Sequence, residues 1–147
     1  MGTQDLTQIA REIVTTYGSA NWTALKNLLT PDATYNEIGT QRKIQGPDSI
    51  ISAMQEWKKT MTDSSGTVNS TLASGDVVVL EVTWQGTQNG AFTGPMGTIP
   101  PSGKHQTTRA AMVVQFQGNK IREIRHYFDM VTFLTQIGAM AMAGARK

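Results

Sequence analysis

Residues 105–128 read HQTTRAAMVVQFQGNKIREIRHYF, and this stretch decides the fold. Two runs rich in β-branched and aromatic residues, 105–117 and 120–128, lie on either side of Gly118-Asn119. Such runs predict strands, and a Gly-Asn pair between them is typical of a tight turn. The segment therefore predicts a long β-hairpin near the end of the chain.

Working outward, the first half of the chain favours helices. Apolar residues recur at helical spacing over 4–17, and a second short helix is predicted from Trp22 until Pro31 stops it. Gly46-Pro47 then has the pattern of a helix start, with proline at the first helical position. We therefore expect three N-terminal helices.

Extended segments are predicted at 33–38, 67–73 and 76–85. Residues 86–103 are rich in Gly, Pro and Thr and are expected to form a long loop, which either shapes a cavity entrance or only supplies turns. A short helix follows residue 129. Helices first and hairpin-linked strands after predict an α+β fold, with helices on one face of a curved antiparallel sheet.

Length and composition narrow the possibilities further. A chain of 147 residues is one domain long, 1–147, and its tail from residue 139 is expected to be loosely held. The net charge is only +2 and the basic residues are scattered, which argues against nucleic acid as a partner. We find no secretory h-region and no apolar run of membrane-spanning length, so we expect a cytoplasmic protein without membrane contact.

Metal and cofactor chemistry are not expected. The chain has no cysteine and only two histidines, His105 and His126, which do not share a metal-ligand spacing. His105 is predicted at the surface. His126 is predicted to point away from Asp129, because alternate residues of a strand face opposite sides.

Both faces of the predicted strands carry apolar residues. In the strand 105–117, Met112, Val114 and Phe116 alternate with Ala111 and Val113. In an antiparallel sheet with one face in water, apolar and polar residues alternate more regularly along each strand than they do here. The helices can cover one face, so we expect a second copy of the chain to cover the other and form a homodimer.

Asp129 lies where the last strand meets the final helix, after an aromatic run. Apolar neighbours that desolvate a carboxylate raise its pKa, which suits a general base working near neutral pH. The alternative is that Asp129 simply caps the helix. The residues alone leave both interpretations open.

Several stretches together resemble one known family. They are Ala33-Thr34-Tyr35-Asn36-Glu37, Gly46-Pro47-Asp48-Ser49-Ile50, Gly86-Thr87-Gln88-Asn89-Gly90, Ile99 to Lys104, and Lys120-Ile121-Arg122-Glu123 leading to Asp129 and Gln136-Ile137-Gly138. In order and spacing, nearly the whole chain resembles the SnoaL-like polyketide cyclases (ester cyclases) of the nuclear-transport-factor-2-like superfamily. The resemblance implies a cone-shaped α+β barrel with three helices on the concave face of its sheet. It also implies a small apolar or aromatic ligand and intramolecular aldol condensation without metal or organic cofactor.

The resemblance also implies roles for particular residues. Asp129 matches the family's acid/base aspartate, and Asn36 matches a pocket amide. The family's assisting histidine falls on Gln115, which can donate a hydrogen bond to an enolate oxygen but cannot shuttle a proton. Val113 replaces a neighbouring polar residue and makes the expected pocket drier.

Three further residues are candidates for substrate contact. Tyr35 and Trp57 are either ordinary core residues or aromatic walls of the cavity, two roles that merge in a cone-shaped barrel. Arg109 shares strand parity with Val113 and Gln115, so it either enters the cavity mouth or lies at the surface.

The leading hypothesis from the sequence is a cofactor-independent enzyme that acts on a small apolar carbonyl compound. Asp129 would transfer the proton, with Gln115 and Asn36 as hydrogen-bonding partners, in a cyclase or isomerase reaction. One alternative is a non-catalytic binding protein that uses the same cavity. The other is epoxide hydrolysis, for which Glu37 or Glu81 would have to supply a second carboxylate.

Overall fold

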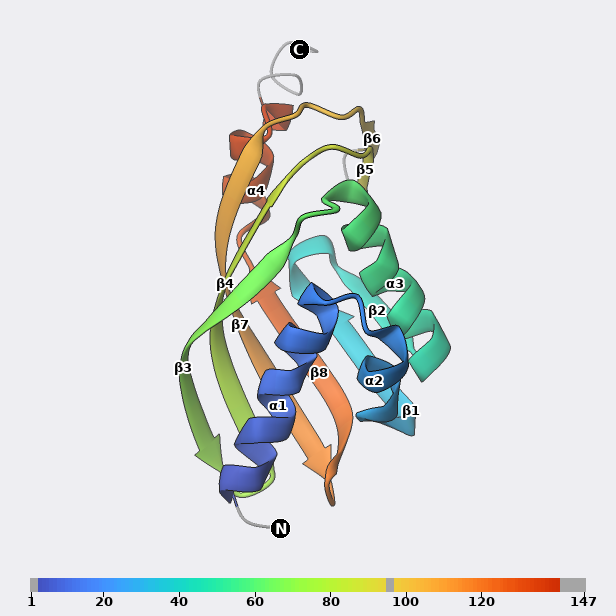
Figure 1. Ribbon diagram of the computed structural model, residues 1–147, viewed down its shortest axis with the longest axis vertical. Coiled ribbons are helices and arrows are strands. Elements are labelled where there is room, and N and C mark those ends of the chain that lie inside the picture. The colour runs from blue at the N-terminus through green and yellow to red at the C-terminus, as the bar shows by residue number, and fades with distance from the viewer. Residues whose placement is uncertain (1–2, 95–96, 141–147) are drawn as a thin grey trace.

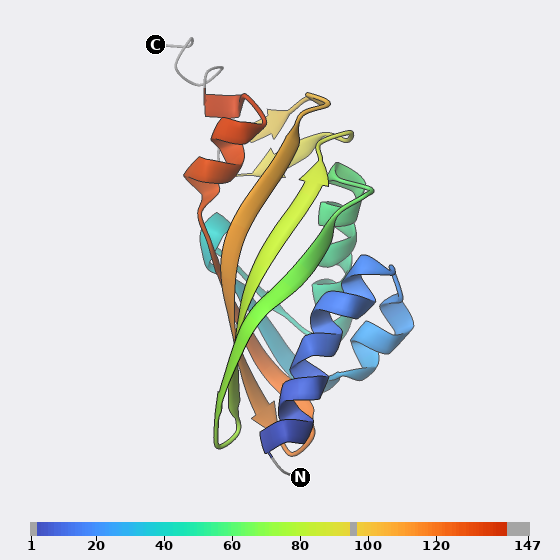
Figure 2. The ribbon, with the colours of Figure 1, turned by 60° about the vertical axis from the view of Figure 1, so that its left-hand side comes forward.

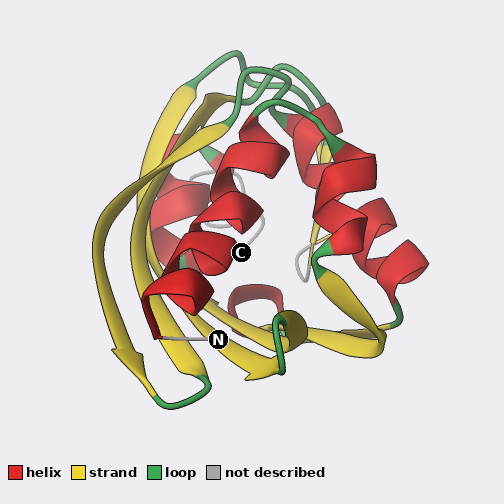
Figure 3. Ribbon diagram, turned by 60° about the horizontal axis from the view of Figure 1, so that its bottom comes forward, coloured by secondary structure: helices red, strands yellow, loops and turns green. Residues whose placement is uncertain are grey.

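The computed structural model describes residues 3–94 and 97–140 and has the expected α+β architecture (Figure 1). Three helices, α1 (Thr3–Gly18), α2 (Trp22–Asn27) and α3 (Pro47–Thr60), lie against the concave side of a curved sheet (Figures 2 and 3). A fourth helix, α4 (Met130–Gln136), follows the last strand. The predicted cone of sheet and concave-face helices is confirmed.

One six-stranded sheet organises the fold. Its strand order is β2-β1-β8-β7-β4-β3, with β1 and β8 parallel and every other pair of neighbours antiparallel. The strands are β1 (Leu29–Glu37), β2 (Arg42–Gln45), β3 (Ser65–Ser74), β4 (Val77–Thr87), β7 (His105–Gln117) and β8 (Lys120–Phe128). A 3₁₀ turn, Ile38–Thr40, joins β1 to β2, and β5 (Phe92–Gly94) pairs with β6 (Gly97–Ile99) in a separate hairpin.

Strand alternation fixes which side chains face the helices. On β7, Met112, Val114 and Phe116 are almost completely buried, whereas the residues between them are only half-buried. The inward set packs against Ile13 of α1 and Ile50 of α3 in the main core. Even-numbered positions therefore point into the cone along β7 from Gln106 to Phe116 and along β8 from Ile124 to Phe128, and this parity determines the site.

The predicted hairpin 105–117 and 120–128 coincides with β7 and β8, but other predicted boundaries need correction. β1 begins at Leu29 rather than at residue 33 and contains Pro31. Proline is tolerated there because the pairing with β8 is irregular between Leu29 and Thr34, so no regular ladder bond is lost. The short strand β2 was not predicted.

The predicted loop 86–103 contains the β5–β6 hairpin, which lies at the same end of the molecule as α4 (Figures 1 and 2). The Gln88 side chain is fully buried and donates to the carbonyls of Gly90 and Pro100, each at 3.1 Å, which holds this segment together. Of the predicted loose tail, Ala139 is buried and Met140 is exposed, and residues 141–147 lie outside the described residues. Over residues 3–94 and 97–140, no helix has both the length and the apolar character that crossing a bilayer requires.

Candidate active site

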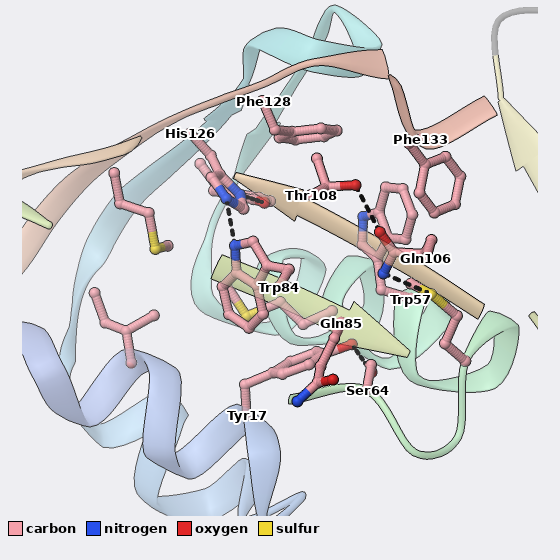
Figure 4. A pocket seen from close by; sticks show the side chains of 15 residues that line it. Tyr17, Trp57, Ser64, Trp84, Gln85, Gln106, Thr108, His126, Phe128 and Phe133 are labelled. Atoms are coloured by element: carbon pink, nitrogen blue, oxygen red, sulfur yellow. Dashed lines mark hydrogen bonds between the residues drawn. The ribbon is translucent and has the colours of Figure 1, made fainter. Parts of the chain in front are cut away.

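A cavity of about 80 Å³ lies between the concave face of the sheet and helices α1 and α3 (Figure 4). Its walls are almost entirely apolar and aromatic. The lining residues are Ile13, Tyr17, Tyr35, Met54, Trp57, Met61, Ser64, Trp84, Gln85, Gln106, Thr108, Met112, His126, Phe128 and Phe133. A mostly apolar hollow with few polar groups is the usual form of a small-molecule site.

Among the residues that line this cavity, His126 has the side chain that can act as a base. Its side chain is only 8% exposed, and both ring nitrogens are hydrogen-bonded. Nε2 lies 3.1 Å from the indole nitrogen of Trp84 (Figure 4). Nδ1 lies 2.7 Å from the hydroxyl of Tyr35. Three strands, β1, β4 and β8, thus place these three side chains together.

The chemistry of the partners fixes the form of the imidazole. An indole N–H can only donate, so Nε2 of His126 must accept and carries no proton. The ring is therefore neutral, with its proton on Nδ1. Desolvation by burial lowers the pKa of His126 from 6.5 to about 4, while the negative charge of Glu37 acts in the opposite direction.

Behind Tyr35 lies a fully buried carboxylate, that of Glu37. Trp57 donates its indole N–H to Oε2 at 2.8 Å, Arg42 donates from Nε to Oε1 at 3.0 Å, and the Thr40 hydroxyl also donates to Oε1. The second Arg42 contact, Nη2 to Oε1, measures 2.9 Å. Burial, the Glu37 charge and a hydrogen bond with Glu37 together raise the pKa of Tyr35 well above its ordinary value.

Two further polar pairs line the cavity. Gln106, 1% exposed, accepts a 2.6 Å bond from the Thr108 hydroxyl and directs its amide toward Met61, with 3.3 Å between Nε2 and Sδ. Across the cavity the hydroxyls of Tyr17 and Ser64 are 2.7 Å apart (Figure 4). Burial raises the pKa of Tyr17 to about 12, so this phenol stays protonated. These groups can orient oxygen atoms of a ligand.

Aromatic rings close the end of the cavity nearest α4. The ring centroid of Trp57 lies 5.2 Å from that of Phe92, 5.6 Å from that of Phe133 and 6.0 Å from that of Phe128. Phe92 comes from the β5–β6 hairpin and Phe133 from α4. The segment 86–103 therefore packs behind the wall at this end, through Phe92, and its described residues supply none of those that line the cavity.

Of the residues predicted from sequence, Tyr35 and Trp57 do line the cavity. The expectation that Asp129 would be desolvated is wrong. Its side chain is exposed and caps α4, accepting from the backbone N–H of Thr132 at 3.2 Å and from its hydroxyl at 2.6 Å. These bonds lower its pKa instead of raising it, and the side chain does not line the cavity. The helix-cap interpretation holds.

Gln115, Val113 and Arg109 lie on the opposite face of β7 from the cavity-lining Gln106, Thr108 and Met112. The Gln115 amide contacts the backbone carbonyls of Asp76 and Phe116, at 3.5 and 3.4 Å. The family resemblance assigned pocket roles to odd-numbered residues of β7, whereas the even-numbered residues of this strand face the cavity. The same one-residue error affects Asn36, which lies between the buried inward residues Tyr35 and Glu37 and does not line the cavity.

Trp84, Gln106 and Thr108 were not predicted from the sequence, and His126 was expected to point away from the site. Glu37 was considered only as the acid of an epoxide hydrolase. A usable signal was present for Gln106 and Thr108. Met112, Val114 and Phe116 are bulkier than the apolar residues between them, which marks their face of β7 as the buried one. Residues two apart on a strand share a face, so Thr108 and Gln106 lie on that face too. His105, predicted at the surface, is exposed.

Comparison with known proteins agrees with this architecture. A model of the SnoaL-like polyketide cyclase family matches residues 7–137. No curated protein sequence matches the chain. Among solved structures, a candidate SnoaL-like polyketide cyclase from Jannaschia is similar, with a TM-score of 0.84 and 18% identity over 93% of this chain and 94% of its own.

Two proteins from Streptomyces are also similar. IdmH, a candidate polyketide cyclase from Streptomyces antibioticus, has a TM-score of 0.78 and 21% identity over 90% of this chain and 98% of its own. AclR, a candidate hydroxylase from Streptomyces galilaeus, has a TM-score of 0.80 and 19% identity over 94% of this chain and 87% of its own. These structural likenesses establish the fold, and the family model covers most of the sequence. The chain belongs to the SnoaL-like polyketide cyclase family.

Proposed function

We propose that this protein is a cofactor-independent enzyme of the cyclase or isomerase type, which removes a proton next to the carbonyl group of a small apolar compound. The observation that carries the proposal is the neutral, buried His126 in the wall of an apolar cavity, beside the donor Trp84. Family membership supports the reaction class. His126 takes the acid–base role that was predicted for Asp129.

The pair formed by His126 and Trp84 suits enolisation. A H–C–C=O unit placed between them would replace their mutual hydrogen bond, with Trp84 donating to the carbonyl oxygen and Nε2 facing the neighbouring C–H. Nε2 then takes the proton, and the electron pair of the broken C–H bond forms the enolate, whose oxygen charge Trp84 stabilises. The enolate carbon attacks a second carbonyl in cyclisation, or regains a proton elsewhere in isomerisation.

Cavity size limits the substrate. A volume of about 80 Å³ is well below the roughly 300–1,000 Å³ typical of sites for drug-sized ligands. We therefore propose a compact ketone of one or two rings, held between the aromatic walls and oriented by Gln106, Thr108, Tyr17 and Ser64.

The test is hydrogen–deuterium exchange at the α-carbon of small cyclic ketones, from cyclohexanone to 2-tetralone, followed by NMR. His126→Gln keeps polarity but removes the base, and should lower the enzyme-catalysed exchange rate by about 100-fold or more. Asp129→Asn is the matched control, because asparagine caps a helix as well as aspartate does, and it should leave the rate unchanged. The proposal is wrong if His126→Gln retains the wild-type rate or if the wild type accelerates exchange of none of these ketones.

A binding protein without catalytic activity is the second candidate. It is favoured by the absence, among the described residues, of any buried side-chain polar atom that lacks a hydrogen-bond partner, since such a lining is stable as it stands. Saturable ketone binding with no acceleration of exchange would establish it. Epoxide hydrolysis has less support, because Glu81 is exposed on β4 and Glu37 lies behind Tyr35 rather than in the lining.

We also propose that the protein forms a homodimer through the outer face of the sheet. Leu72, Val79 and Val113 are register partners across β3, β4 and β7 and form an apolar row there. Leu72 is 72% exposed and Tyr127, on the same face of β8, is 42% exposed. A self-complementary contact between two copies would cover this row.

A further inference from the structure

We infer that Glu37 is a positioning residue which, through Tyr35, holds His126 as the Nδ1–H tautomer while substrate is bound. The inference rests on the proposed role of His126 and adds a requirement to it. A general base must present an unprotonated nitrogen to the substrate. Imidazole has two nitrogens, and the neutral ring supplies only one lone pair.

Trp84 cannot keep the tautomer in place during the reaction. In the empty cavity its indole N–H donates to Nε2 and so excludes a proton from that atom. In the proposed reaction this N–H turns to the substrate oxygen, and Nε2 is then free to carry the proton. Unconstrained histidine prefers its proton on Nε2, and a ring in that form could not act as a base toward the substrate.

The partners of Glu37 supply the missing constraint. Arg42, Trp57 and Thr40 all donate to its carboxylate, and the positive charge of Arg42 offsets its burial. Glu37 lies two residues after Tyr35 on the same face of β1, and both side chains are buried. Since the Tyr35 oxygen accepts from Nδ1 of His126 in the empty cavity, we infer that its O–H is directed toward this carboxylate, which can only accept. The Tyr35 oxygen therefore presents a lone pair to His126, 2.7 Å away, and only a protonated Nδ1 can satisfy it.

The chain of bonds therefore has one direction: His126 Nδ1–H to Tyr35, and Tyr35 O–H to Glu37. It leaves Nε2 as the lone-pair nitrogen whether or not Trp84 is bonded to it. When Nε2 takes the substrate proton, the imidazolium keeps its Nδ1–H bond to Tyr35, and the Glu37 carboxylate stabilises the new charge. A buried carboxylate sets the tautomer of the base in the same way in serine proteases, although there it contacts the imidazole directly.

The tautomer can be measured on the resting protein by ¹⁵N NMR of labelled histidine, without any substrate. We expect a protonated Nδ1 and an unprotonated Nε2 for His126 in the wild type. The decisive variant is Trp84→Phe, which removes the donor to Nε2 and mimics its withdrawal by substrate. His126 should remain the Nδ1–H tautomer in Trp84→Phe and become mainly Nε2–H when Tyr35→Phe is added.

Glu37→Gln in the Trp84→Phe background tests the carboxylate itself. An amide cannot accept from all four donors, so the Nδ1–H population should fall, as in the Tyr35 double variant. If Glu37→Gln does not fold, the Tyr35 double variant still decides the matter. Glu56→Gln, which removes the exposed partner of Arg42 at 3.0 Å, and Tyr127→Phe, on the outer face of β8, are matched controls that should leave the imidazole signals unchanged.

Activity gives a second readout. Tyr35→Phe alone should lower ketone exchange by roughly 10- to 100-fold, as for other residues that orient a reacting group from behind. A switch to Nε2–H in Trp84→Phe alone, or no switch in the double variants, overturns the inference and leaves the proposed function standing. The expected tautomers together with full exchange activity in His126→Gln would instead overturn the proposed function.

Discussion

At the scale of single residues, His126 and Asp129 both have lowered pKa values, and they differ in burial and in their position relative to the cavity. His126 is buried in an apolar wall and bonded to neutral donors and acceptors, whereas Asp129 is exposed and bonded to the start of a helix. Desolvation keeps the imidazole neutral, so its lone pair is available throughout the neutral pH range. A carboxylate with a lowered pKa is ionised there too, but it lies outside the cavity lining.

This environment predicts a pH dependence of stability. The pKa of His126 is 6.5 in its ordinary state and about 4 in the folded protein, so the unfolded chain binds more protons between these values. The contribution of the neutral His126 to the free energy of unfolding is therefore fully present above pH 6.5, and it is lost as the pH falls toward 4. A difference of this size corresponds to roughly 3 kcal/mol of stability at neutral pH.

Urea unfolding between pH 4 and pH 7 measures this effect. His126→Gln removes the titrating group, and its free energy of unfolding should change much less over that range than that of the wild type. Equal pH slopes for the two proteins would contradict the buried, neutral state of His126. His105→Gln, at an exposed position, is the control that should keep the wild-type slope.

At the scale of elements, the long segment before β7 is held to the end of α3. The Gly90 N–H donates to the Thr60 carbonyl at 2.9 Å, and the Thr60 hydroxyl donates to the Ala91 carbonyl at 2.9 Å. A Cβ at Gly90 would collide with the backbone carbonyl of Lys59, which cannot move without disturbing the helix end. This contact places the β5–β6 hairpin, and with it Phe92, at the aromatic end of the cavity.

Gly90→Ala should therefore lower the free energy of unfolding by about 1–3 kcal/mol, the usual cost of overpacking. Gly18→Ala is the control, because a Cβ there meets only the Ser65 Cβ at 4.0 Å, an ordinary contact. Its stability should be unchanged or slightly higher. Chemical denaturation of the two variants measures both. A Gly90→Ala protein as stable as the wild type would show that the hairpin is not held against α3.

The spacing of apolar residues and the positions of turn-forming residues were sufficient to predict most helices and strands, including α1, α3 and the β7–β8 hairpin. They were insufficient for β2 and for the β5–β6 hairpin, whose short strands have little periodic pattern and depend on tertiary contacts such as those of Gln88. The site was harder to predict because a one-residue shift of parity reverses every side chain of a strand. That shift placed Gln115 in the site instead of Gln106 and Thr108, and it added Asn36 beside the correctly predicted Tyr35.

At the scale of the whole molecule, the two faces of the sheet have different roles. The concave face holds the cavity and the core, and the outer face carries the apolar row Leu72, Val79 and Val113. Arg125 is the next register partner of Val113 and is bonded to Glu123 at 2.6 Å, so the row ends at a charged pair. A polar margin around an apolar centre is the usual composition of a protein interface.

Val113→Lys should convert the proposed dimer into a monomer, because it would bury an unpaired charge at the centre of the contact. Analytical ultracentrifugation at micromolar concentration distinguishes the two states. Glu56→Gln, at an exposed position of α3 away from the outer face of the sheet, should leave the dimer intact. A wild-type protein that sediments only as a monomer would contradict the proposed interface.

The central claim is that a carbonyl ligand binds between Trp84 and His126. An NMR titration of the wild-type protein with 2-tetralone tests it most directly, by following the Trp84 indole N–H, His126 Nε2 and the Asp129 carboxyl carbon together. We predict large changes at Trp84 and His126 as the ligand replaces their mutual hydrogen bond, and none at Asp129. Saturable changes at Asp129 with Trp84 and His126 unmoved would contradict the account.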